Sequence, residues 1–444
     1  ISADNIIVTG TSVEYQNVNL YEYCSDNPIN FQDPSGHFIL SALAGAGAYF
    51  FEAIVSLGAS YLLTKEIAGV VDEFAWYRKS QKEKRDEALL SILQKYIDTV
   101  WSDKNIKIIL CGSVLSFMEN NVLSEKSPLF GRRDSQIRLE AFSYLEAAEF
   151  VPNYSNEDKA VCYGITGGVA KYLSMIDPER SIDENIVKLF FRTDGYLYDE
   201  TRNLLTQEFS DIAIVNNIIE QIANGENSLN IIAGKIGEKE TTVLYSLEKL
   251  IGVGLIEKKK CITDEKNKKK TQYVLKDYMF KFWYEFIPKA TSVIEMGQGE
   301  IYYQKVVKPV LHSFMGAVFE DMCRYYTFAQ GIKGEYGCFV TSVGTWWGVE
   351  NITDKDGNVK SQSADIDVVA ISEIDRKAIV GECKFKNEKI DKGIYDTLIR
   401  RGKLIAAKYK VSKYILFSLS GYTDWFKSLS DGDVLLLTLD SLYE

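Results

Sequence analysis

The chain has 444 residues, of which 46% are hydrophobic and 25% charged, the balance expected of a globular protein with several domains. The formal net charge of −11 argues against a protein that coats nucleic acid nonspecifically, but it is compatible with a local basic patch. Seven scattered cysteines without a CxxC pair, together with only two histidines, argue against zinc and favour a reducing compartment such as the cytoplasm. The chain begins with Ile1 and has no signal-peptide pattern, so we expect a fragment of a longer product.

The first segment, residues 1–37, contains the sequence NLYEYCSDNPINFQDPSGH at positions 19–37. Its Asn-Pro and Asp-Pro-Ser-Gly runs are typical of simple turns, which is one interpretation. The segment also resembles the end of the RHS repeat-associated core, the shell that carries C-terminal toxin tips. The family pattern P-x₄-D-P-x-G is present as Pro28, Asp33, Pro34 and Gly36, and His37 stands where leucine is usual. The resemblance implies that the rest of the chain is a toxin tip that secretion delivers to a target cell's cytoplasm.

Residues 38–66 form an apolar linker that is rich in alanine, glycine and aromatic residues. The uncharged run ends where Glu52 follows Phe51, which is short of the ~20 apolar residues that a membrane-spanning helix needs. We therefore expect a buried helix or a helical hairpin of small residues. Membrane contact through residues 38–64 is the alternative that we do not favour.

Four fragments follow in a regular order between residues 67 and 198. They are AGVVDEF with Asp72 and Glu73, the apolar IKIILCGS ending at Ser113, SPLFGRRDSQIRL with Arg132 and Arg133, and YGITGGVAKYL at 163–173. Together they resemble the second half of an archaeal-type AAA+ ATPase. The resemblance implies a Walker B-like acidic pair, a sensor-1-like strand and two arginines that could face nucleotide phosphates. It also implies a truncated ATPase half at 67–150 and a helical lid at 151–210.

The phosphate loop of such ATPases is missing from the sequence. No G-x-x-x-x-G-K-[ST] occurs, and the Gly-Lys pairs at Lys235 and Lys403 lack the required glycine and Ser/Thr. Without those backbone amides and that lysine, ATP phosphates have no cradle, so we expect no ATP hydrolysis and do not favour ATP as a cofactor. The sensor-1-like strand would also lose a neighbour. Either residues 38–63 cover its edge or this half is loosely folded.

Residues 211–275 have the pattern of a winged helix. We expect helices at 212–224, 229–236 and 240–251, and strands at 255–262 and 271–275. The turn between the strands carries Lys266, Lys268, Lys269 and Lys270. A helix in the major groove with a basic wing on the phosphates is a DNA-binding geometry, so DNA is the favoured partner. A structural joint with solvated lysines, or an oligomerising module, is the alternative.

The last region, residues 303–444, follows a connector at 276–302 and alternates between helix and strand patterns. Residues 306–326 favour a helix with Val310, Phe314, Val318 and Met322 on one stripe. Strand patterns follow at 338–349, 365–371, 378–384, 414–418 and 434–439, with a helix pattern at 390–409. This order predicts a mixed sheet with helices packed on it.

Three charged residues stand out in SADIDVVAISEIDRKAIVGECKFK, which reads as a β-hairpin. Glu382 and Lys384 share one strand face, and hairpin pairing can bring Asp367 near them. Two carboxylates can hold Mg²⁺ or Mn²⁺, and a lysine beside them can orient or deprotonate an attacking water. Charges that merely alternate with apolar residues on an exposed hairpin are the alternative.

The fragments FMGAVFEDMCRYY, TWWG, ADIDVVA and GECK are similar to the C-terminal domain of unknown function that follows archaeal-type ATPases, and more broadly to the PD-(D/E)XK nuclease superfamily. The resemblance implies Glu320 as the helical glutamate, Asp367 and Glu382 as metal carboxylates, and Lys384 as the catalytic lysine. It also implies a restriction-endonuclease-like fold in an α/β and α+β multidomain chain. A nuclease-like module is thus our leading hypothesis. A non-catalytic DNA-binding or oligomerising regulator and a fragment of an ATP-binding AAA+ protein remain alternatives.

Overall fold

The computed structural model describes residues 5–9, 38–42, 51–57, 87–102, 106–112, 118–209, 211–267, 270–353, 359–429 and 432–444. These residues belong to two compact units, one of Ile1–Ala141 with Thr206–Ser210, and one of Phe142–Leu205 with Asp211–Glu444. Several predicted residues lie outside the described ranges: Pro28, Asp33, Pro34, Gly36, His37, Asp72, Glu73, Ser113, Lys268 and Lys269. The predictions made on them therefore stay predictions.

The first unit is built on a five-stranded sheet with the order β2-β3-β4-β1-β5. Its strands are β1 (Asn5–Thr9), β2 (Phe38–Ala42), β3 (Phe51–Leu57), β4 (Ile106–Gly112) and β5 (Ser135–Arg138). The helical elements are α3 (Glu87–Lys95), η1 (Tyr96–Val100) and η2 (Met118–Val122). Buried residues of α3, β4 and η2 share one apolar cluster that includes Leu90, Leu110 and Met118. The predicted strand that begins at Ile106 is therefore present as β4.

The prediction of a helix in residues 38–66 is wrong for the described parts, because β2 and β3 are strands. Their sequences, FILSA and FEAIVSL, contain aromatic and β-branched residues that favour strands. Strand β4 also offers an edge to which β3 pairs, from Phe51↔Gly112 to Leu57↔Ile106. The expectation that this segment covers the edge of β4 is thus confirmed, with a strand in place of a helix.

The strand directions differ from those of the expected partial P-loop-type sheet. All described pairs in the first unit are antiparallel: β1 with β4 and β5, and β3 with β2 and β4. Parallel strands need crossover connections of a dozen or more residues, whereas only residues 43–50 separate β2 from β3. The short connection therefore imposes the antiparallel pairing.

The second unit begins with a helical region where the lid was predicted. Its helices are α5 (Tyr144–Ala148), α6 (Asn156–Thr166), α7 (Ala170–Leu173), α8 (Ile182–Phe190) and α9 (Tyr196–Glu208). Helix α6 starts at the N-cap Ser155, whose side chain accepts from Asp158 N, and ends at the left-handed Gly167. Among the helices in the described part of the chain, none is long and apolar enough to span a bilayer.

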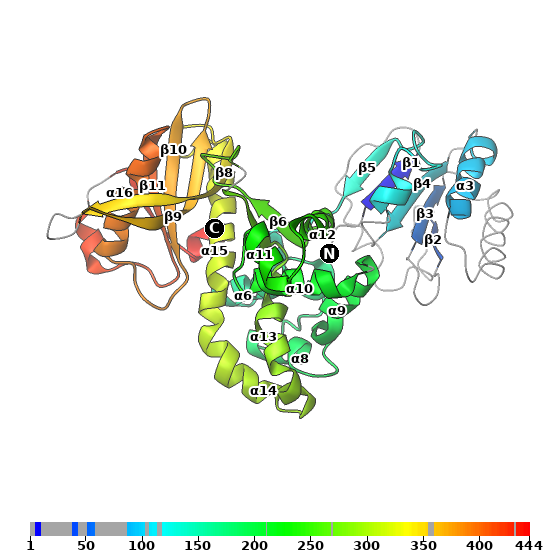
Figure 1. Cartoon of the computed structure of the whole chain (residues 1–444), viewed down its shortest axis with the longest axis horizontal. Helices are drawn as coiled ribbons and strands as arrows, with labels where there is room; N and C mark the ends of the chain where they lie inside the picture. The colour runs from blue at the N-terminus through cyan, green and yellow to red at the C-terminus, as the bar shows by residue number, and fades with distance from the viewer. Residues whose placement is uncertain are drawn as a thin grey trace. The chain divides into compact units, whose positions relative to one another are not determined.

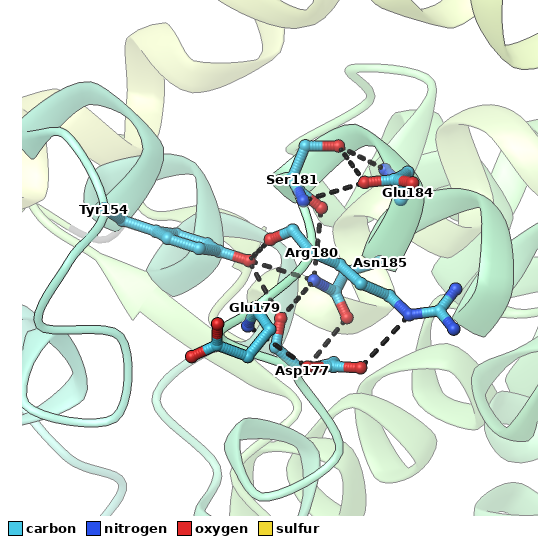
Figure 2. A network of polar contacts seen from close by, with 7 residues as sticks. All are labelled: Tyr154, Asp177, Glu179, Arg180, Ser181, Glu184 and Asn185. Atoms are coloured by element: carbon cyan, nitrogen blue, oxygen red, sulfur yellow. Dashed lines mark hydrogen bonds and ion pairs between the residues drawn. The ribbon is translucent and has the colours of Figure 1, made fainter.

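A buried polar network fixes the loop between α7 and α8 (Figure 2). The Asn185 amide, which is inaccessible to solvent, donates to the carbonyls of Asp177 at 2.9 Å and Ser181 at 3.1 Å, and to the Tyr154 hydroxyl at 2.9 Å. Its oxygen accepts from Asp177 N at 2.9 Å. Ser181 and Glu184 form a capping box at the start of α8. One side chain thus satisfies several backbone groups of this loop.

The predicted winged-helix elements follow with small shifts at their ends. They are α10 (Ile212–Ala223), α11 (Leu229–Ile236), α12 (Glu240–Gly252), β6 (Ile256–Lys259) and β7 (Gln272–Leu275). The buried stripe of α12 contains Val243, Leu247 and Leu250, as predicted. Strand β6 ends at Lys259 instead of continuing to Ile262, because Cys261 and Ile262 leave the hairpin and enter the core of the C-terminal region.

Two long helices, with three short helical segments between them, connect this hairpin to the C-terminal region. They are α13 (Tyr278–Glu295), α14 (Gly299–Tyr302), η4 (Tyr303–Val307), η5 (Lys308–Val310) and α15 (Leu311–Ile332). Phe314, Val318 and Met322 are buried on α15 as predicted. Val310 is 43% exposed, so its predicted place on that stripe is wrong. It is the N-cap of α15 and lies one residue before the buried face begins.

The C-terminal region contains a mixed five-stranded sheet with the order β12-β11-β10-β9-β8. Its elements are β8 (Ser342–Thr353), β9 (Val359–Ser372), β10 (Lys377–Lys384), α16 (Lys392–Ala406), β11 (Lys410–Ser418), η6 (Asp424–Ser428), β12 (Val434–Thr438) and η7 (Asp440–Leu442). Strands β8, β9 and β10 pair antiparallel, whereas β10, β11 and β12 pair parallel. Helices α15 and α16 pack against the sheet (Figure 1). The predicted order of helices and strands is confirmed.

The helical region and the C-terminal region share contacts inside the second unit. The Tyr144 hydroxyl donates to the Leu442 carbonyl at 2.7 Å, and the Asn156 amide donates to Asp440 at 2.7 Å. Helix α6 approaches α15 closely, since a Cβ added at Gly164 would lie 2.5 Å from the Met315 sulfur. A side chain at Gly164 would therefore require the Met315 side chain to move.

We expect Asn185→Ala to loosen the loop before α8, because buried backbone groups lose their hydrogen-bond partners at a cost of roughly 2–4 kcal/mol. Hydrogen exchange of the amides at 177–185 should then accelerate by about 30- to 900-fold. The matched control is Asn203→Ala on the exposed side of α9, which should leave that exchange unchanged. Equal exchange in the two variants would contradict the role given to Asn185.

Candidate functional site

Three of the four predicted site residues lie on the hairpin of β9 and β10, and the fourth lies on α15. Asp367 belongs to β9, and Glu382 and Lys384 belong to β10. The hairpin forms because both strands carry apolar residues that are buried on both faces of the sheet, from Val368 to Ile371 and from Ala378 to Val380. The carboxylates thus stand at the end of an otherwise apolar ladder.

Asp367 is buried, with 8% of its surface exposed, and its position is fixed by the neighbouring strand. Its Oδ2 accepts a hydrogen bond from Cys383 N at 2.9 Å. Burial is the largest cause that raises the pKa of Asp367 to about 7; the Glu382 carboxylate raises it as well, whereas the Cys383 amide and Lys384 lower it. Asp367 and Glu382 are therefore close enough to repel each other when both are ionised.

Glu382 and Lys384 point toward each other on β10. The Lys384 ammonium donates to Glu382 Oε1 at 2.6 Å, and Glu382 is 8% exposed. Burial is the largest effect on Lys384 and opposes its charge, but Glu382, Asp367 and Cys383 together outweigh burial and raise the pKa of the lysine. Lys384 is therefore held as a cation, which makes it a poor proton acceptor at neutral pH.

Glu320 approaches the same carboxylates from α15. Burial raises the pKa of Glu320 to about 7, and the negative charge of Asp367 adds to this effect against the opposing charges of Arg324 and Lys259. Its side chain is 34% exposed. The structure thus brings Glu320, Asp367, Glu382 and Lys384 to one place, although they are distant in sequence.

Whether these residues suit a metal ion depends on the oxygens that they offer. In the described part of the chain, no group of three or more His, Cys, Asp and Glu side chains has the arrangement of a metal site. However, Glu382 Oε2 is buried and accepts no hydrogen bond within the described structure. Mg²⁺ commonly uses only one or two carboxylates and keeps several waters. The pair Asp367 and Glu382 fits that kind of site and does not fit a closed cage of side chains.

Two further residues on α15 belong to this place and were not predicted from the sequence. Arg324 is 8% exposed and contacts Glu320 and Asp321, with Nη1 3.5 Å from Glu320 Oε2. The Tyr278 hydroxyl donates to Asp321. Burial is the largest effect on Asp321 and disfavours its charge, but Arg324, Lys259 and Tyr278 together outweigh burial and lower the pKa of Asp321. The available signal was the spacing of Glu320 and Arg324, which places them on one helix face.

The predicted arginines of the ATPase-like half have partners within the first unit. Arg132 forms a paired contact with Asp98, at 2.7 Å from Nε and 2.8 Å from Nη2, and this carboxylate raises the pKa of the arginine. Arg133 donates to the Gln136 side chain at 3.0 Å. Neither contact requires a nucleotide. Arg132 would have to leave Asp98 in order to bind a phosphate.

The described wing lysines are on the surface of the second unit. Lys266 is exposed, whereas Lys270 lies 3.3 Å from Asp264. Further lysines that were not singled out from the sequence, Lys258 and Lys260, are exposed at the end of β6. Lys258 also lies over the Tyr273 ring. The positive surface of the wing therefore begins in the strand and extends into the turn.

Comparison with known proteins supports both resemblances to archaeal proteins. Residues 47–176 match a family described as an ATPase domain predominantly from Archaea, and residues 283–394 match a family described as Archaea bacterial proteins of unknown function. An archaeal-type ATPase domain and a domain of unknown function are thus present in the chain. The first match begins inside the predicted linker 38–66 and ends inside the predicted helical lid 151–210.

An uncharacterized protein of Methanocaldococcus jannaschii is 27% identical over 373 residues, which are 84% of this chain and 79% of that protein. No solved structure matches the chain. The similarity to the relative spans most of both chains, and the second family match includes Glu320, Asp367, Glu382 and Lys384.

We expect the stability of the second unit to fall as pH rises from about 4 to 7 without divalent cations. Asp367 and Glu320 have pKa values of about 7 when folded, above their ordinary values, so the folded state holds protons that the unfolded state has lost. The contribution of Asp367 is full below its unfolded pKa and is lost as pH passes through the folded pKa, by at most about 1.4 kcal/mol per pH unit.

Urea unfolding in EDTA at several pH values measures this dependence. Asp367→Asn should make the decline with pH shallower, because it removes one of the carboxyl groups whose pKa is raised in the folded state. Asp396→Asn, at an exposed position of α16, is the control and should keep the wild-type slope. A slope in Asp367→Asn as steep as in the wild type would contradict the raised pKa.

Proposed function

We propose that the C-terminal region is a metal-dependent phosphodiesterase module of the PD-(D/E)XK nuclease type. The observation that carries this proposal is the excess of negative charge that the neighbouring buried carboxylates of Asp367 and Glu382 create; burial first, and then the Glu382 carboxylate, raise the pKa of Asp367 to about 7. A divalent cation offsets such an excess and brings phosphate oxygens to the same place.

Mg²⁺ or Mn²⁺ is the proposed cofactor, held by the carboxylates of Asp367 and Glu382. The buried oxygen Oε2 of Glu382, which lacks a hydrogen-bond partner in the described structure, is a suitable ligand atom. The ion would supply Lewis-acid polarisation of the phosphodiester and charge neutralisation. Asp367 Oδ2 accepts a hydrogen bond from Cys383 N, so the Asp367 carboxylate would keep a fixed orientation when it binds the ion.

The protein residues divide the remaining chemistry between them. Lys384, held as a cation by Glu382, can stabilise the negative charge that builds up on the phosphate. Glu320, with a pKa of about 7 and partial exposure, is the better proton acceptor for the attacking water. Hydrolysis would form a bond from the water oxygen to phosphorus and break one ester P–O bond. The proton of the water would pass to Glu320, and the leaving oxygen would take a proton from solvent.

Nucleic acid is the proposed substrate, and DNA is favoured because a winged-helix segment precedes the site in the same compact unit. We do not propose ATP hydrolysis, since the ATPase-like region has no phosphate-loop sequence. Delivery as the tip of an RHS toxin stays a hypothesis that rests on the turn sequence at residues 28–37.

The test is cleavage of supercoiled plasmid with Mg²⁺ or Mn²⁺ by purified protein. Asp367→Ala should abolish cleavage, and Glu320→Gln and Lys384→Ala should slow it by about 100-fold or more. Lys386→Ala is a matched control, because this exposed lysine lies two residues beyond Lys384, and it should cleave at the wild-type rate. Equal cleavage by all variants, or none by the wild type, would remove the proposal.

A second candidate function is duplex binding without catalysis, and the exposed lysines of the wing favour it. We expect the triple variant Lys258→Ala, Lys260→Ala, Lys266→Ala to bind duplex DNA more weakly and to flatten the dependence of log K on log salt by about 2–3. The control replaces three exposed lysines elsewhere: Lys289, Lys403 and Lys410. Binding that depends on neither set, or on both equally, would count against a DNA-binding wing. Wild-type binding by Asp367→Ala, in the absence of any cleavage, would favour this second function over the first.

A further inference from the structure

The sheet has a defect at Asp367. Strand β8 pairs with β9 at Gly344↔Val369 and next at Trp346↔Ile366, so Asp367 and Val368 lie opposite the single residue Thr345. On the other side, the ladder between β9 and β10 ends at Gly381↔Val368. Asp367 therefore sits in a β-bulge, one residue beyond the end of its pairing with β10. Its buried carbonyl needs a donor that the ladders do not supply.

Arg324 supplies that donor. Its Nη1 donates to the Asp367 carbonyl at 2.7 Å and to Thr345 Oγ1 at 3.1 Å, so one guanidinium bridges both strands of the bulge. The Thr345 hydroxyl lies 3.5 Å from the same carbonyl. Arg324 is itself held by Asp321, which Tyr278 contacts from α13. The guanidinium is thus held by Asp321 on one side and by the bulge on the other.

The bulge is also where the wing segment reaches the C-terminal sheet. Ile262 N donates to the Thr345 carbonyl at 3.2 Å, and Ile262 belongs to the same apolar cluster as Trp346 and Ile366. Gly344 permits this approach, since a Cβ there would lie 3.3 Å from the Ile262 Cβ. Lys259 of β6 lies 3.9 Å from Asp321. Backbone, apolar and charged contacts therefore all join the wing to the residues around Arg324.

We propose that Arg324 is a positioning residue that sets the place of Asp367 by replacing the ladder hydrogen bonds lost at the bulge, and that Ile262 of the wing segment holds the bulge in that shape. The wing and the carboxylate site then form one mechanical unit, in which nucleic acid bound at the wing is presented at a fixed distance from Asp367. The relevance of this position to catalysis rests on the proposed function. The positioning itself does not.

The first test follows the Asp367 and Glu320 carboxyl carbons by NMR during pH titration of the metal-free protein. Thr345→Val removes the bridging hydroxyl and keeps the volume, so the Asp367 midpoint should move by about half a unit or more. Thr345→Ser should restore the wild-type midpoint. Thr341→Val, which removes a similar hydroxyl that bonds the Ile371 carbonyl in the same sheet, should leave it unchanged.

Substitutions of Arg324 separate its charge from its geometry. Arg324→Lys keeps the positive charge but lacks the planar guanidinium that contacts Asp321 on one side and the Asp367 carbonyl and Thr345 on the other, so the Glu320 midpoint should stay near the wild-type value while the Asp367 midpoint moves. Arg324→Gln should raise the Glu320 midpoint by about one unit, because an opposing charge is lost. The half-buried carboxyl of Glu200, whose partner Tyr172 lies outside this network, serves as an internal reference and should not move in any folded variant.

The role of the wing is tested by Gly344→Val, whose side chain should displace Ile262. Faster hydrogen exchange at the Ile262 amide, accompanied by a moved Asp367 midpoint, is the expected result. Faster exchange with an unmoved midpoint would overturn the coupling. Wild-type midpoints in both Thr345→Val and Arg324→Lys would overturn the positioning role. Because these titrations need neither metal nor substrate, shifted midpoints in a protein that cleaves no DNA would support the positioning and reject only the nuclease.

Discussion

The burial of two carboxyl groups in one apolar sheet is the constraint on which the C-terminal region depends. Asp367 and Glu382 adjoin the buried stretches of β9 and β10, so water cannot solvate their charges freely. The protein meets this cost with a backbone amide at Asp367, an ammonium at Glu382 and a guanidinium between the helix and the bulge. These partners stabilise the charges only in part, as the raised pKa of Asp367 and Glu320 indicates. A structure that keeps such residues at a cost in stability is typical of functional sites.

The sequence predicted the hairpin and its neighbours well because their patterns are local. Apolar runs of strand length around a polar turn define β9 and β10, and the parity of positions 382 and 384 places both side chains on one face. Helix α15 was predicted from its apolar stripe, although its start was placed too early. The proximity of Glu320 to Asp367 came from family resemblance, since no local pattern reports which helix covers which strand.

Other features could not be read from local patterns. The bulge at Asp367 depends on the register between two strands, which is set by tertiary packing. In the sequence, Arg324 cannot be told from a surface charge on an amphipathic helix. Its role is visible only in the structure, where it donates to the Asp367 carbonyl that the strands leave without a donor. In the first unit, an Ala- and Gly-rich composition suggested a helix, but the free edge of β4 recruits these residues as strands. Strand β6 ends early for a similar reason, since Cys261 and Ile262 gain more burial in a neighbouring core.

The tight approach of Gly164 to Met315 bears on how this chain can be divided or recombined. Helix α15 takes part in two interfaces. One of its sides carries Glu320 of the carboxylate site, and another packs against α6 at Gly164. A fragment that starts at residue 303 would expose Met315 and Val318 to water, because it lacks α6. It would also lack Tyr144, whose hydroxyl donates to the Leu442 carbonyl. The smallest piece that could be transplanted intact therefore begins near α5 and not at residue 303, where the C-terminal region begins.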